Sequence, residues 1–244
     1  MPVSAGRKKE KRNVLENVIL NSAASGVCLS LAAYGAGVLI KRKWNYALVN
    51  PLMIAIALVI IFLLVSGVEY ETYNESARYL SYLLTPATVS LAIPMYEKLQ
   101  LLKDNYAAIF TGIFAGVLAS LTSVFAMAVL FGLSKAEYVT LLPKSVTTAI
   151  GMGIADELGG YSEIAAAVII ITGVLGNMAA EPICRFFAIR HPIAKGIAIG
   201  TSAHAIGTAK AMEMGETEGA MSSLAIVAAG VCTVAGAAVF AGLM

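Results

Sequence analysis

The sequence is poor in charge. Only 13% of its 244 residues are Asp, Glu, Lys or Arg, whereas 59% are hydrophobic and the mean hydropathy is +0.80. Soluble domains usually carry about 25% charged residues. This composition excludes an ordinary soluble domain and predicts an integral membrane protein. The net charge of +2 gives no electrostatic support for binding nucleic acid, so we expect no nucleic-acid partner.

Catalytic and metal-binding motifs are also lacking. The chain has only two histidines, and it contains no HExxH, no Gly-x-Ser-x-Gly and no P-loop. A hydrolase built from Ser202 and His204 would lack a convincing acidic partner. We therefore expect no enzyme, no metal and no cofactor. Cys28, Cys184 and Cys232 are odd in number and widely spaced, so we expect three buried small hydrophobic residues and no disulfide framework.

Long stretches without any charge are the main positive feature. Six such windows have about the length of 17–25 residues that crosses a bilayer, or more. They cover residues 17–40, 44–68, 79–96, 105–134, 164–180 and 219–244. We predict an all-α polytopic membrane protein of about seven or eight membrane segments, including broken or re-entrant helices. Residues 1–16 would form a basic N-terminal extension and residues 17–244 one transmembrane domain.

Two further windows, 145–155 and 196–209, are too short to span and hold most of the polar side chains. By the positive-inside rule, the basic clusters at 41–43 and 185–195 are expected in the cytoplasm. This orientation requires one short window to be re-entrant. In hydrocarbon each unpaired polar group costs several kcal/mol, so the short windows are either buried among helices or line a watery cavity.

Three polar segments resemble one another. Aligning Pro86–Met95 with Pro143–Met152 gives five identical positions, and a further offset of 56 pairs residues 149–151 with 205–207. Internal duplication and a shared membrane composition are equally good explanations. In either case, helices broken at Pro or Gly leave backbone N–H groups that can hold an anion, as in secondary transporters.

These segments supply the candidate site. Lys144 would meet an anion, or alternatively reach toward the lipid headgroups. His204 would bind substrate or carry a proton, or alternatively act as a packing residue. Glu181 is a second candidate proton carrier, or alternatively a carboxylate at a helix end. The proposed binding residues are Thr85, Thr88, Lys144, Ser145, Thr147, Thr148, Thr201, Ser202, His204 and Thr208.

Two GxxxG patterns, Gly112–Gly116 and Gly196–Gly200, permit close approach of helix backbones. We expect them to pack helices within the fold.

From about residue 25 to the end, the order of motifs resembles the LrgB/CidB family of membrane proteins. The motifs are Asn50-Pro-Leu-Met-Ile-Ala, Leu84-Thr-Pro-Ala-Thr-Val-Ser-Leu-Ala-Ile-Pro94, Leu142-Pro-Lys-Ser-Val-Thr-Thr148, Thr172-Gly-Val-Leu-Gly176 and Gly200-Thr-Ser-Ala-His-Ala-Ile-Gly-Thr-Ala209. Two features depart from the family pattern. One is the basic N-terminal stretch from Met1 to about Arg12. The other is Ala149, which stands where a proline is expected, so the helix break in this segment is alternatively expected at Gly151 and Gly153.

The resemblance implies two functions. The family is described as antiholin-like, connected with murein hydrolases and cell lysis in bacteria, and usually acts with a small LrgA/CidA-like membrane partner. A plant relative is a plastidial glycolate/glycerate transporter, and bacterial members are linked to pyruvate and other small carboxylates. We expect a secondary transporter for small monocarboxylates in the bacterial plasma membrane, as a homo-oligomer. An antiholin that modulates lesions, and a scaffold that controls a hydrolase by contact, are the alternatives.

Overall fold

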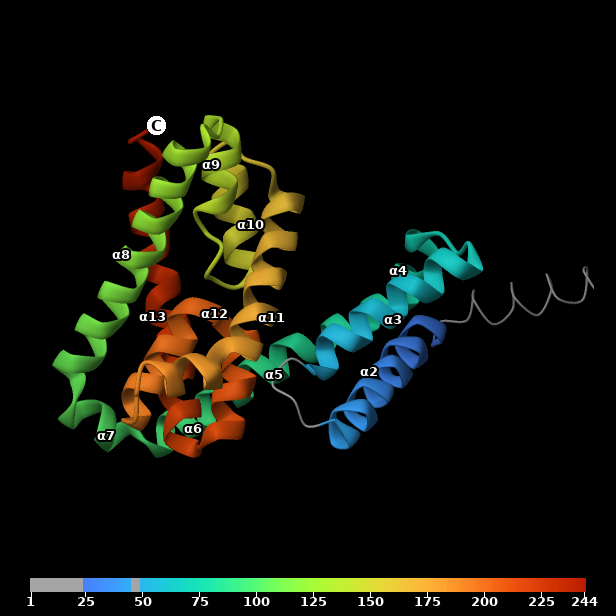
Figure 1. Ribbon diagram of the computed structural model, residues 1–244, viewed down its shortest axis with the longest axis horizontal. Coiled ribbons are helices and arrows are strands. Elements are labelled where there is room, and N and C mark those ends of the chain that lie inside the picture. Colours follow the sequence, from blue (N-terminus) through green and yellow to red (C-terminus); the bar gives the residue numbers. More distant parts are fainter. Residues whose placement is uncertain (1–23, 45–48) are drawn as a thin grey trace, which may run out of the picture. The chain divides into compact units, whose positions relative to one another are not determined.

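A computed structural model describes residues 24–44 and 49–244, and every regular element in these ranges is a helix (Figure 1). The basic extension predicted for residues 1–16 lies outside them. The chain divides into two compact units, residues 1–88 and 89–244, which are described separately.

Unit 1 is built on two longer helices and three short ones. They are α2 (Ser25–Lys43), α3 (Pro51–Ser66), α4 (Tyr70–Ala77), the 3-10 helix η1 (Arg78–Leu83) and α5 (Leu84–Ser90), whose last two residues belong to unit 2. Glycines on α2 allow close packing on two partners. A Cβ on Gly26 would lie 2.6 Å from the Ser76 hydroxyl, and one on Gly37 would lie 2.5 Å from the Pro51 carbonyl oxygen.

Helix α3 shows why these residues start and stop a helix where they do. The Asn50 side chain accepts hydrogen bonds from the N–H groups of Leu52 and Met53, Pro51 occupies the first turn, and Gly67 ends the helix at φ 68°. This apolar helix has 16 residues, about 24 Å, and is shorter than a usual membrane span.

The charge-free window over residues 79–96 does not form one continuous helix, so it is not confirmed as a span. Within unit 2 the chain continues from α5 through α6 (Ala92–Glu97) and α7 (Leu99–Asp104), so this region is a series of short helices. Pro86 and Pro94 each occupy the third position of a short helix. A proline is tolerated there because N–H groups of the first turn have no intrahelical partner, whereas in a helix interior it removes a hydrogen bond and kinks or breaks the helix.

Three helices in the described part of the chain are long and apolar enough to cross a membrane. They are α8 (Tyr106–Phe131), α11 (Ser162–Phe186) and α13 (Glu216–Ala241). They confirm helices in the windows 105–134, 164–180 and 219–244, but not a count of seven or eight segments. Along α8 a stripe repeats every three or four residues and is buried, namely Ile109, Ile113, Val117, Leu121, Val124 and Ala128. Large apolar side chains such as Phe110 and Phe114 are exposed on the same helix, as a lipid-facing surface requires.

Each pair of consecutive long helices is joined by a helical hairpin (Figure 1). Hairpin 1 consists of α9 (Lys135–Leu141), a turn at 142–147 and α10 (Thr148–Glu157). A Cβ on Gly160 would meet Thr140 at 2.7 Å, and one on Gly151 would meet the Pro143 carbonyl oxygen at 3.3 Å, so the two sides run antiparallel. Helix α10 passes through Gly151 and Gly153 without interruption, so the alternative break at those glycines is wrong.

Hairpin 2 is helix α12 (Pro192–Met214), which is kinked at His204 into leg 1 (residues 192–203) and leg 2 (residues 205–214). Gly200 of leg 1 and Thr208 of leg 2 both contact Ser222 of α13. Gly196 approaches the Glu218 carbonyl oxygen at the start of α13, and Gly219 of α13 approaches Met212. Positions equally far from His204 therefore meet the same part of α13, which shows that the chain folds back at the kink.

Both GxxxG patterns pack helices within unit 2, as expected. A Cβ on Gly196 or Gly200 would lie 2.5 Å from a carbonyl oxygen of α13. A Cβ on Gly112 would contact the Ile197 side chain, and one on Gly116 would lie 2.9 Å from the Thr201 hydroxyl. Leg 1 of α12 therefore lies between α8 and α13 at backbone-contact distance.

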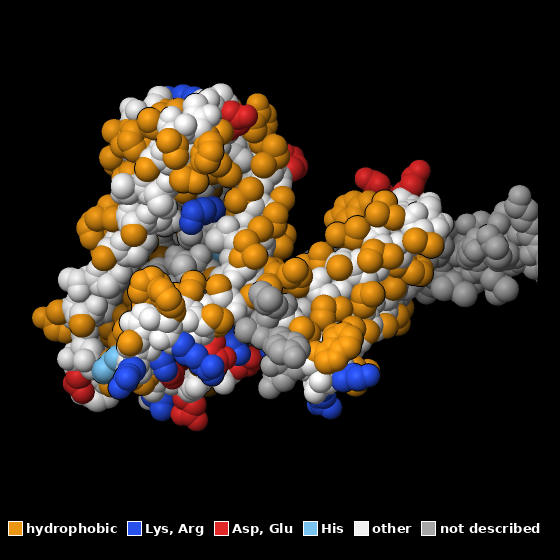
Figure 2. Space-filling model, viewed as in Figure 1, with side chains coloured by type: hydrophobic (Ala, Val, Ile, Leu, Met, Phe, Trp, Pro, Cys, Tyr) orange, Lys and Arg blue, Asp and Glu red, His pale blue; other side chains and the backbone are white. Residues whose placement is uncertain are grey.

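Charged side chains of unit 2 gather at its two ends, with one basic side chain part-way between them (Figure 2). The three cysteines are free, and Cys184 is buried as predicted. Cys232 is only partly buried, and the prediction of burial is wrong for Cys28, which is exposed on α2.

Candidate functional site

The turn of hairpin 1 places Lys144 against hydroxyl groups. Its Nζ donates to Ser145 Oγ at 3.1 Å and to Ser120 Oγ of α8 at 3.3 Å. The two serine oxygens are themselves 3.1 Å apart. Lys144 is partly buried and has no carboxylate partner among the described residues. An ammonium group with only hydroxyl neighbours can receive a small anion.

Helix α10 begins directly beside this lysine. Its N-cap residue, Thr147, makes no capping bond through its side chain. The N–H groups of the first turn therefore stay open to a ligand, and they carry the partial positive charge of a helix N-terminus. Thr147 and Thr148 are partly buried at this point, so the predicted hydroxyls of this segment lie next to Lys144 in the chain and at the start of the helix.

The turn of hairpin 2 depends on an unusual backbone conformation. His204 has φ 42° and ψ −141°, a combination that residues with a Cβ seldom adopt. Such a conformation costs of order 1–3 kcal/mol and persists only when the surrounding structure holds it.

The His204 side chain supplies part of that support. It is 3% exposed, and its Nε2 lies 3.0 Å from the main-chain oxygen of Ile169 in α11. Because a carbonyl only accepts, Nε2 carries the proton and donates. The ring packs over Gly173, where a Cβ would lie 2.6 Å from its Cε1, and Gly176 faces Ala203 in the same way. The two glycines of the Thr172–Gly176 motif thus make room for the kink.

The tips of the two hairpins meet the same face of α8. Hairpin 1 bonds to Ser120, and Thr201 of hairpin 2 packs on Gly116. Positions 116 and 120 are one helical turn apart, about 6 Å along the axis, and near the middle of this 26-residue helix. Lys144 and Ser145 therefore contact α8 one turn away from the contact of Thr201, whose own hydroxyl donates to the Ile197 carbonyl oxygen of leg 1 at 2.8 Å. His204 points to α11 instead and is not in contact with Lys144.

The remaining predicted binding residues have other surroundings. Thr208 is fully buried and bonds to the His204 carbonyl oxygen and to Ser222 Oγ at 2.7 Å. Ser202 is exposed and donates to its own helix at the Ala198 carbonyl oxygen. Thr85 and Thr88 are exposed residues of α5 in unit 1, so their participation in this site stays a prediction.

Glu181 lies at the end of α11, away from both tips. Its carboxylate pairs with Arg185 at 2.8 Å and with Lys210 of leg 2 at 3.4 Å. Lys210 also pairs with Glu213 at 3.2 Å. Among the described residues, neither Lys144 nor His204 forms an ion pair with it.

Sequence reasoning missed two hydroxyls that complete the tips. Ser120 and Ser222 lie in long apolar windows, in α8 and α13, with no motif around them. The one sequence feature that could have indicated them is that a serine inside a spanning window needs a hydrogen-bond partner. In the structure Ser120 bonds to hairpin 1 and Ser222 to hairpin 2.

Three long apolar helices, two helical hairpins and a polar cluster at their tips define a helical membrane protein with an ordered internal polar site. The chain belongs to the LrgB-like family, whose sequence profile matches residues 30–243. It is 39% identical over 210 residues, 86% of this chain, to the antiholin-like protein LrgB of Bacillus cereus strain B4264, covering 91% of that protein. The antiholin-like protein LrgB of Bacillus anthracis strain CDC 684 / NRRL 3495 gives the same identity and coverage. No solved structure matches the chain significantly.

Proposed function

We propose that this protein carries small monocarboxylates such as pyruvate, glycolate, glycerate or lactate across the bacterial plasma membrane. The observation that supports this function is the Lys144 ammonium group, which is partly buried and touches only hydroxyls within the described chain. A carboxylate supplies the missing countercharge. The hydroxyls of Ser120 and Ser145 can then hold a 2-hydroxy or 2-oxo group. The substrate undergoes no chemical change, so we propose neither enzymatic activity nor a cofactor.

The hairpins suit such a carrier. In a bilayer spanned by α8, α11 and α13, hairpins 1 and 2 would be re-entrant segments that enter from opposite ends of unit 2. Secondary transporters place broken helices of this kind around a substrate near the midplane. Movement of the hairpins against the long helices would expose the site alternately to each side.

Proton coupling is a further part of the proposal. His204 changes charge near neutral pH when its surroundings allow it. Its contact with Ile169 links it to the backbone of a spanning helix, so a change in its protonation would alter the tip of hairpin 2. Glu181 is the other candidate, through its ion pair with Lys210.

Antiholin-like control of lesions and murein hydrolases is the second candidate function. The names of the relatives support it better than transport, because both are called antiholin-like proteins and neither name mentions a substrate. It predicts an LrgA/CidA-like small membrane partner and assembly into a homo-oligomer. A lesion needs apolar interfaces between helices and no ordered anion site.

Uptake by purified protein in liposomes separates the two functions. Transport predicts saturable uptake of labelled pyruvate, glycolate or lactate under a pH gradient, reduced at least tenfold in Lys144→Ala. Lys135→Ala is the matched control, because Lys135 is an exposed lysine at the start of α9. No saturable uptake with any of these substrates, or equal loss in both variants, would contradict the carrier.

The second function is tested in the same vesicles. Antiholin-like action predicts dye leakage through the small partner protein that this chain suppresses, with no effect of Lys144→Ala. Suppression that depends on Lys144 would instead connect lysis control to the anion site.

A further inference from the structure

A pocket of about 580 Å³ opens at the end of unit 2 where α11 meets both legs of α12. Four cations and two carboxylates line it, namely Arg185, Arg190, Lys195, Lys210, Glu181 and Glu213. Its volume lies within the range of about 300–1,000 Å³ that is usual for small-molecule sites. The hairpin tips lie elsewhere, since Lys195 precedes Thr201 by six residues, about 9 Å of helix.

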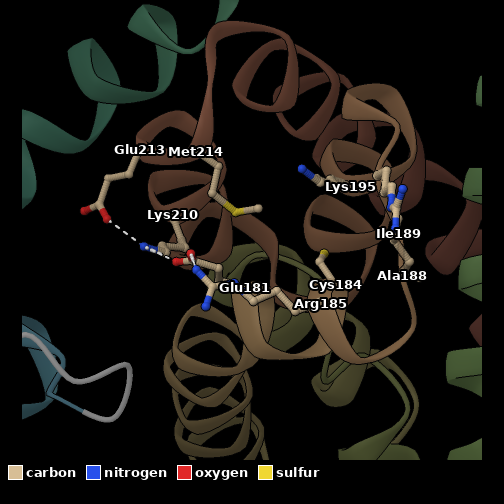
Figure 3. A pocket seen from close by; sticks show the side chains of 10 residues that line it. Glu181, Cys184, Arg185, Ala188, Ile189, Lys195, Lys210, Glu213 and Met214 are labelled. Atoms are coloured by element: carbon tan, nitrogen blue, oxygen red, sulfur yellow. Dashed lines mark hydrogen bonds and ion pairs between the residues drawn. The ribbon is translucent and has the colours of Figure 1, made fainter.

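The charges on one wall of this pocket neutralise one another. Lys210 lies between Glu181 and Glu213, at 3.4 and 3.2 Å, and Arg185 is 2.8 Å from Glu181. Figure 3 shows this cluster of ion pairs on one side of the pocket, with the Lys195 side chain on the opposite side.

The other two cations that line the pocket, Arg190 and Lys195, keep an excess of positive charge. Arg190 is exposed and makes no ion pair with the described residues. Lys195 has only a long ion pair, 3.7 Å, to Glu218 of α13. A guanidinium group and a second cation that line the same pocket can bind phosphate well, because the planar fork of arginine matches two phosphate oxygens.

We propose that this pocket is a second anion site, separate from the hairpin tips, and that it binds a small phosphate-bearing anion between Arg190 and Lys195. The site does not depend on the proposed transport function. Arg190 lies in the α11–α12 connection, Lys195 on leg 1, and Lys210 and Glu213 on leg 2. A phosphate group bound between Arg190 and Lys195 therefore holds leg 1 of hairpin 2 against the α11–α12 connection, and its occupancy regulates how freely this hairpin moves.

Thermal unfolding of the full-length protein in nanodiscs of neutral lipid tests the site, with inorganic phosphate as the probe. We expect phosphate to raise the unfolding temperature saturably, with chloride at equal ionic strength having little effect. Arg190→Gln should raise the half-saturating phosphate concentration at least tenfold. Lys195→Arg should retain most of the binding. Lys135→Gln, an exposed cation on α9, should match the wild type.

A second arm distinguishes free phosphate from a lipid headgroup. Nanodiscs that contain phosphatidylglycerol should stabilise the wild type more than Arg190→Gln if the headgroup occupies the pocket, and added phosphate should then have less effect. Either source supports the site when it depends on Arg190. The proposal is overturned if neither probe stabilises the protein, if chloride acts as well as phosphate, or if Lys135→Gln weakens binding as much as Arg190→Gln. The unfolding temperature of Arg190→Gln without phosphate shows that the variant is folded.

Discussion

His204 Nε2 donates to the carbonyl oxygen of Ile169 at 3.0 Å, and this bond joins the most strained residue of α12 to the first half of α11. The backbone of His204 would suit glycine better, since its φ is 42°. The histidine side chain therefore fixes the tip of hairpin 2 in a conformation that its backbone does not favour.

Replacing His204 tests this relationship. His204→Ala loses the hydrogen bond and keeps the strain, whereas His204→Gly loses the bond and relieves the strain. We expect the alanine variant to be the less stable of the two by about 1 kcal/mol, with both below the wild type. Thermal unfolding in detergent measures the difference. Equal stability of the two variants would show that the backbone at position 204 is not strained.

Gly173→Ala should destabilise unit 2, because its Cβ would lie 2.6 Å from the His204 ring. The loss of unfolding free energy caused by Gly173→Ala should be smaller in a His204→Gly background, because the histidine ring is then absent. A double-mutant cycle of unfolding free energies measures this coupling, which we expect to be about 1 kcal/mol or more. Strict additivity would contradict direct packing of the ring on Gly173. Some cost will remain in both backgrounds, since Ile206 Cβ lies 3.0 Å from the same position.

Ser120 is expected to matter for substrate binding although it lies in α8. Its hydroxyl is within 3.3 Å of Lys144 Nζ and 3.1 Å of Ser145 Oγ. Ser120→Ala should raise the KM for carboxylate uptake by about tenfold, the scale of a hydrogen bond to a charged group, with a smaller change in maximal rate. Ser123→Ala is the matched control, because Ser123 is exposed on the same helix and donates only to the Ser120 carbonyl oxygen. The same KM in both variants would remove Ser120 from the site.

The sequence predicted the long helices α8, α11 and α13 because unbroken apolar windows leave no other structure in a bilayer. It also identified windows 145–155 and 196–209 as unusual, and both lie at hairpin turns. It could not place Ser120 beside Lys144 or Glu181 beside Lys210, since both pairs join residues more than 20 positions apart. The charge-free window at residues 79–96 has the length of a span, but a count of charges cannot show where the short helices η1, α5 and α6 begin and end; only the break expected at Pro or Gly in this segment pointed to them.

The start of α9 provides a prediction on pH. The Ser134 hydroxyl and backbone N–H both donate to Glu137 Oε2, at 2.7 Å each, and these hydrogen bonds lower the pKa of Glu137 from its ordinary value. A lowered pKa in the folded state means that the contribution to stability is present above the unfolded pKa and is lost as the pH falls through the folded value. Glu137→Gln should therefore lose less stability than the wild type on acidification below about pH 4. Unfolding temperatures at pH 7 and in acid measure this effect, and a larger loss of stability in acid for Glu137→Gln than for the wild type would contradict it.

The N-cap serine of the same helix can be tested at constant pH. Ser134→Ala should lower the free energy of unfolding by about 1 kcal/mol at pH 7, and Ser134→Thr should recover most of this loss.

Two glycine substitutions of the same kind should have opposite effects. Gly200→Ala would place its Cβ 2.5 Å from the Ser222 carbonyl oxygen, and backbone atoms on both sides cannot yield without separating leg 1 from α13. Gly153→Ala meets nothing within 4 Å and lies inside helix α10, where alanine is favoured over glycine by about 1 kcal/mol. We expect Gly200→Ala to lower the unfolding temperature and to abolish uptake, and Gly153→Ala to leave uptake unchanged and raise the unfolding temperature slightly. Destabilisation by Gly153→Ala would mean that α10 is not a continuous helix. Tolerance of Gly200→Ala would mean that leg 1 does not contact α13 at backbone distance, and hairpin 2 would then need another support.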